Sequence, residues 1–170
     1  MNTSDERLRA VIELTLERYG QGLVDQIAQL AEAARGAVVD AAVPRCPEWT
    51  LSQLVEHVGQ TQHWVASIVE KRVSDPSQLP TSVAALPADQ DAWASWLAEG
   101  ASRLGAACVD ADADAPVWNP AGDGLSGTRF WLRRVLAETI IHGPARPPPL
   151  AWSTSSTPSS PPMRSPITWR

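Results

Sequence analysis

The chain has 170 residues, a length that suits one domain with a sizeable core and is short for two. Its 19 acidic residues outnumber its 14 lysines and arginines, and the net charge of −5 argues against electrostatic binding to nucleic acid or to an anionic membrane. Because the sequence has no basic-then-apolar leader and no run of about 20 apolar residues, we expect a cytoplasmic protein with reduced cysteines, no nucleic-acid partner and no membrane partner.

The first predicted element is helical and covers residues 4–34. Apolar side chains recur there at helical spacing in two stripes, with Gly20 and Gly22 between them. The segment is therefore either two helices or one helix with a soft point at residues 19–22. Pro44 and Pro47 then predict an extended connection, because proline donates no backbone hydrogen bond and pushes the preceding residue out of helical conformation.

The second helix, expected over residues 51–73, has the clearest start in the chain. Thr50 and Gln53 have the spacing of a capping box, and Trp49 can pack on Leu54 as a hydrophobic staple. Gly59 inside this helix costs about 1 kcal/mol relative to alanine. That cost points to close packing or to a site at Gly59.

Residues 74–87 contain three prolines and no periodic pattern, and they are predicted to form a linker. Fourteen extended residues span on the order of 45 Å, more than the roughly 35 Å of the preceding helix. The linker can therefore return the chain along the bundle, so that a third helix over residues 89–109 runs parallel to the second. A fourth helix, from a cap near Thr128 to His142, completes an all-α four-helix bundle.

The composition changes abruptly after His142. Residues 143–170 contain no acidic residue, eight of the 15 prolines and nine serines or threonines, so residues 1–142 carry a net charge of −8. We expect one domain over residues 1–142 and a disordered or aberrant tail over residues 143–170. A shifted reading frame or a gene fragment would explain such a tail.

Two motif-like stretches lack the residues that their chemistry needs. Asp110, Asp112 and Asp114 match the first ligands of a calcium loop, but its sixth and twelfth positions are alanines where glycine and glutamate are required. Residues 124–128 begin like a G-x-S-x-G nucleophile elbow but end in Thr128, and no strand precedes them. We expect neither site.

Three residues have spacing that suits a metal ion. Glu138 and His142 are four residues apart, so both side chains point to one side of the fourth helix, while His57 lies on the apolar face of the second. Such a pair is usually a surface hydrogen bond, and a lone inward histidine such as His57 is usually a core residue. His63 lies toward the flank of the same helix. If the linker returns the chain, however, two imidazoles and one carboxylate converge, a set that suits zinc with a fourth position open.

Two segments resemble a known family. Residues 43–59, followed by His63 and Trp64, and residues 130–142 resemble the two signature stretches of the mycothiol-dependent maleylpyruvate isomerase metal-binding domain, over roughly residues 20–142. That family has the DinB-type four-helix bundle with a long crossover between helices 2 and 3. The resemblance places His57, Glu138 and His142 at the positions of a divalent metal, normally zinc, and implies the small thiol mycothiol as cosubstrate.

The resemblance implies a mycothiol-dependent isomerase or thiol transferase that acts on a small unsaturated or electrophilic substrate. In an isomerase of this kind the metal-activated thiolate adds to a conjugated double bond, the bond rotates, and the thiol is expelled. The alternative is a non-catalytic or truncated metal-binding domain. It arises because the family's fourth helix normally continues past the last histidine with an arginine directly after it, whereas Gly143 and Pro144 follow here.

Cys46 and Cys108 are interpreted as packing residues that the chemistry does not need. Arg134 is expected to face solvent or to form a structural salt bridge, and Trp64 and Trp131 to be pocket walls or core residues.

Overall fold

A computed structural model describes residues 3–44, 46–112, 115–121 and 127–142, with side chains from residue 16 onward. The predicted tail over residues 143–170 lies outside the described residues. So do Asp114 of the rejected calcium loop and most of the rejected nucleophile elbow.

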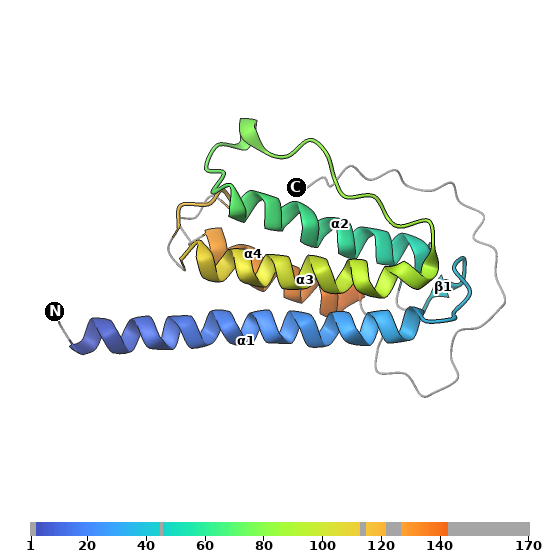
Figure 1. Cartoon of the computed structure of the whole chain (residues 1–170), viewed down its shortest axis with the longest axis horizontal. Helices are drawn as coiled ribbons and strands as arrows, with labels where there is room; N and C mark the ends of the chain where they lie inside the picture. The colour runs from blue at the N-terminus through green and yellow to red at the C-terminus, as the bar shows by residue number, and fades with distance from the viewer. Residues whose placement is uncertain (1–2, 45, 113–114, 122–126, 143–170) are drawn as a thin grey trace.

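Four helices make up most of the described chain (Figure 1): α1 (Thr3–Ala34), α2 (Leu51–Glu70), α3 (Trp93–Asp110) and α4 (Gly127–His142). The prediction of an all-α chain with four helices is confirmed in its main features. One addition is a two-stranded antiparallel hairpin of β1 (Ala42–Val43) and β2 (Cys46–Thr50), in the segment predicted only to be extended. Strand β1 has only two residues, too few for an alternating pattern, and Pro47 lies within β2, where it argues against a strand in the sequence.

The first helix, α1, is one continuous helix, which decides between the two alternatives for residues 4–34. At Gly22 the backbone of α1 passes close to α4, because a β-carbon there would already touch the Leu136 side chain at 3.4 Å. Leu23, Ile27 and Leu30 are at most 1% exposed and form the face that packs on the bundle. Gly22 therefore serves the packing of α1 on α4, and neither glycine breaks the helix.

The start of α2 follows the predicted capping box. The Thr50 side chain accepts a hydrogen bond from the Gln53 backbone N–H at 3.3 Å, and the Gln53 side chain accepts one from the Thr50 N–H at 2.9 Å. Close packing at Gly59 is confirmed as well, because a β-carbon there would overlap the indole ring of Trp96 on α3. The helix ends at Glu70, three residues earlier than expected.

The long connection between α2 and α3 returns the chain as predicted, and it contains two single-turn 3-10 helices, η1 (Pro76–Gln78) and η2 (Gln90–Ala92). Figure 1 shows α2 and α3 running in the same direction and α4 running opposite to α2. Two indole groups fix the crossover: Trp64 Nε1 donates to the Pro80 carbonyl at 2.9 Å, and Trp93 Nε1 donates to the Pro87 carbonyl at 2.9 Å. The tryptophans therefore hold the loop against the helices through the partner that a buried indole N–H requires.

The remaining tryptophan contacts lie in the core. Trp131 of α4 is fully buried, donates to the Trp118 carbonyl at 2.6 Å, and packs edge to face on Trp64 with ring centroids 5.8 Å apart. Of the two interpretations of Trp64 and Trp131, core residue therefore fits the structure. Thr128 is not the cap of α4 but lies in its first turn, fully buried.

In the described part of the chain, no helix combines the length and the apolar character needed to span a bilayer.

Candidate metal centre

The structure brings together the three candidate metal ligands, His57, Glu138 and His142. His57 comes from the second turn of α2, and Glu138 and His142 come from the last two turns of α4. Because α4 runs opposite to α2, these turns meet at one end of the bundle (Figure 1). One potential ligand atom from each residue lies within 4.8 Å of the other two.

Each oxygen of the Glu138 carboxylate has its own partner. Oε2 lies 3.2 Å from Nε2 of His142, and Oε1 accepts a hydrogen bond from Arg134 at 2.6 Å, one helical turn earlier. The structural salt bridge, one of the two alternatives for Arg134, is the one that the structure contains. The Arg134 side chain is 48% exposed, so this pair adds little to stability but fixes the direction of the carboxylate.

An aromatic side chain of the β2 strand covers both imidazoles. The Trp49 ring stacks on His142 with centroids 5.8 Å apart and an angle of 7° between the planes, and it meets His57 edge to face at 4.9 Å. The two imidazoles are themselves 5.8 Å apart and nearly perpendicular. Trp49 was expected to act as a hydrophobic staple, and its contacts with the two histidines went unrecognised in the sequence.

The charge state of His57 suits a metal ligand. Burial lowers the pKa of His57, the neighbouring His142 lowers it further, and Glu138 opposes the shift. The imidazole is therefore neutral at pH 7 and has a free lone pair, which is the form that binds a metal.

The donor set fits a divalent transition metal. Two imidazole nitrogens and one carboxylate oxygen are a ligand set of catalytic zinc sites, which keep a fourth position open. A tetrahedral zinc ion with bonds of about 2.0–2.1 Å separates its ligands by about 3.3 Å, so donors within 4.8 Å of one another need only small side-chain adjustments.

Cys46, interpreted from the sequence as a packing residue, lies beside this cluster, with its Sγ 3.6 Å from Nδ1 of His142. Its position just before α2, at the same end as His57, was the available clue. His63, which helical spacing placed toward the flank of α2, is instead buried between α2 and α3, with Nε2 3.2 Å from the Trp96 carbonyl.

The two cysteines are expected to differ sharply in reactivity. Cys108 is fully buried, and burial raises the pKa of its thiol to about 12, so almost no thiolate is present at pH 8. Cys46 is partly exposed. We expect iodoacetamide at pH 8 to alkylate Cys46 in the native protein and Cys108 only after unfolding, as measured by peptide mass spectrometry. Equal labelling of both thiols in the native protein would contradict this.

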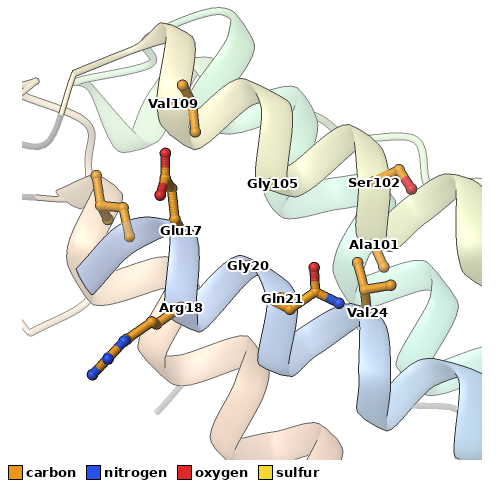
Figure 2. A pocket seen from close by; sticks show the side chains of 10 residues that line it. Glu17, Arg18, Gly20, Gln21, Val24, Ala101, Ser102, Gly105 and Val109 are labelled. Atoms are coloured by element: carbon orange, nitrogen blue, oxygen red, sulfur yellow. The ribbon is translucent and has the colours of Figure 1, made fainter. Parts of the chain in front are cut away.

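A separate groove lies between α1 and α3, with a volume of about 520 Å³. Figure 2 shows Gly20 and Gly105 lining it from the two helices, and neither has an atom within 4 Å of where a β-carbon would be. The groove shares no lining residue with the histidine cluster and contains no histidine or cysteine. The groove therefore offers no ligand set for a transition metal.

Residues 21–144 match the family model described as the mycothiol maleylpyruvate isomerase N-terminal domain. The match includes His57, Glu138 and His142 and both resembling segments. No curated protein and no solved structure matches the chain.

Proposed function

Because this chain belongs to the mycothiol maleylpyruvate isomerase N-terminal domain family, we propose that it is the metal-binding domain of a mycothiol-dependent enzyme. In this proposal His57, Glu138 and His142 hold one divalent cation, zinc, and the helices form a DinB-type bundle. The observation that carries the proposal is the convergence of these three side chains from two antiparallel helices into one cluster.

The number of protein donors in the cluster supports a metal site with one open position. Three protein donors leave a tetrahedral metal one place for an exogenous ligand, and the sulfur of a small thiol fits that place. A bound zinc ion supplies Lewis acidity that keeps such a thiol deprotonated near neutral pH, and the thiolate is the nucleophile.

The residues of this chain have positioning roles in the proposed reaction. Arg134 holds Glu138 Oε1, so that Oε2 is directed toward His142, and Trp49 restricts both imidazoles by packing on them. In the reaction itself, the thiolate forms a C–S bond with a conjugated double bond, the former double bond rotates, and the C–S bond breaks. The thiol is regenerated and the substrate is isomerised, so no oxidant or reductant is needed.

The test is a thiol-dependent conversion by the purified, zinc-loaded chain. We expect the ultraviolet spectrum of maleylpyruvate, the substrate in the family's name, to change in the presence of mycothiol and not in its absence. Removal of zinc with a chelator should stop the change, and adding zinc back should restore it. An identical rate with and without mycothiol would refute the enzymatic part, while the zinc content of the same sample tests the metal site separately.

A further inference from the structure

The two ring nitrogens of His142 face different partners. Nε2 lies 3.2 Å from Glu138 Oε2, whereas Nδ1 lies 3.6 Å from the sulfur of Cys46. A neutral imidazole carries one proton, so one nitrogen donates a hydrogen bond and the other presents a lone pair. The partners of the two nitrogens therefore decide which of them is available to a metal.

The arrangement favours Nε2 as the metal-binding nitrogen. Nε2 points to the carboxylate that belongs to the proposed ligand set. With a cation bound between Nε2 and that carboxylate, the ring proton would reside on Nδ1, directed at the Cys46 sulfur. Metal-binding histidines commonly donate their second ring N–H to a neighbouring acceptor, which fixes the tautomer and the ring orientation. Sulfur is a weak acceptor with a longer hydrogen bond than oxygen, and 3.6 Å is within its reach.

The position of Cys46 is set by the hairpin. Cys46 is the first residue of β2 and pairs with Val43, which is 2% exposed. The hairpin is tied to the start of α2 because the backbone N–H groups of Leu51 and Ser52 donate to the carbonyls of Ala41 and Val39, both at 2.9 Å. The sulfur is therefore placed by a hairpin that is hydrogen-bonded to the start of α2, the helix that carries the proposed ligand His57.

A second contact from the same strand acts on the same ring. Trp49, three residues after Cys46, stacks on the face of His142 with only 7° between the planes. The strand β2 thus contacts His142 at its edge through Cys46 and at its face through Trp49. Within the described residues, the set of donors that could surround one ion contains His57, Glu138 and His142 but not Cys46.

We infer that Cys46 is a positioning residue of the metal centre: its sulfur accepts the hydrogen bond of His142 Nδ1–H and holds the ring with Nε2 turned toward Glu138. This inference rests on the proposed metal site. Two other roles for Cys46 are a fourth metal ligand and a residue that only packs. The three roles predict different zinc affinities and different spectra of the cobalt-loaded protein.

The first experiment measures zinc affinity by competition with a chelator. Cys46→Ala is expected to weaken binding by about 10–100-fold, the usual effect of losing an outer partner of a ligand. Cys46→Ser is expected to recover most of that loss, because its hydroxyl oxygen accepts a hydrogen bond. Cys108→Ala, a matched control in the core, should bind zinc like the wild type, and unchanged affinity in Cys46→Ala would overturn the inference.

Two measurements on the wild-type chain keep the inference testable even if Cys46→Ala fails to fold. In the zinc-loaded protein, nitrogen-15 NMR should show His142 protonated on Nδ1, and the opposite tautomer would refute the inference. In the cobalt-loaded protein, the near-ultraviolet thiolate-to-cobalt band should be absent before mycothiol is added. A band that Cys46→Ser removes would make Cys46 a ligand and overturn the positioning role.

The outcomes also separate this inference from the proposed function. If the wild-type chain binds neither zinc nor cobalt, the proposed metal site fails and the inference falls with it. If the wild-type chain binds metal and Cys46→Ala binds it equally well, only the role of Cys46 is refuted.

Discussion

Replacing His142 with alanine is expected to remove stoichiometric zinc from the protein. His142 contacts Glu138, faces His57 and lies against Cys46 and Trp49. Without it, two donors remain, and two protein ligands rarely hold zinc against water. The expected loss of affinity therefore exceeds the roughly 10–100-fold effect of an outer partner.

The measurement is zinc per chain by elemental analysis, together with a thermal-shift titration. Zinc at about 100 times its dissociation constant should stabilise the wild type by about 2.7 kcal/mol, which raises its melting temperature, and should leave His142→Ala unchanged. Ile141→Ala is the matched control, because Ile141 is the preceding residue of α4 and its side chain is 59% exposed. Equal, substoichiometric zinc in the wild type and in His142→Ala would rule out the site.

Replacing Gly59 with alanine is expected to destabilise the fold by about 1–3 kcal/mol, although alanine is the better helix former by about 1 kcal/mol. The β-carbon would overlap the Trp96 ring, which is only 9% exposed and is rigid, so it cannot turn aside as a flexible chain end could. Relief requires α2 and α3 to separate. The loss should appear as a lower midpoint of urea unfolding, followed by circular dichroism.

Two control variants make this second prediction specific. Gly105→Ala on α3 should stabilise the protein by about 0.5–1 kcal/mol, because nothing lies within 4 Å of its β-carbon position. In a Trp96→Leu background the Gly59→Ala change should cost little, since the two residues are coupled through direct contact. A Gly59→Ala protein that is as stable as the wild type would contradict the close packing seen at this position.

Local sequence patterns predicted the helices well because their causes are local. The capping box of Thr50 and Gln53 joins residues three apart and fixes the start of α2. The predicted cap at Thr128 was wrong, since the structure buries that side chain in the first turn of α4, where packing overrides the preference of threonine for a cap. The hairpin was missed because β1 has only two residues and Pro47 lies within β2, and because backbone pairing leaves little trace in the side-chain pattern.

The sequence by itself determined the four helices, the return of the chain through the long linker, and the pairing of Glu138 with His142 on one helical face, because each depends on periodicity or on length. Only the tertiary structure decided which residues surround that pair. Cys46 and His142 are 96 positions apart, and their contact depends on where the hairpin at the start of α2 meets the end of α4. Contacts of that kind arise from the packing of whole elements, so residue spacing along the chain could not reveal that Cys46 and Trp49 complete the surroundings of the histidines.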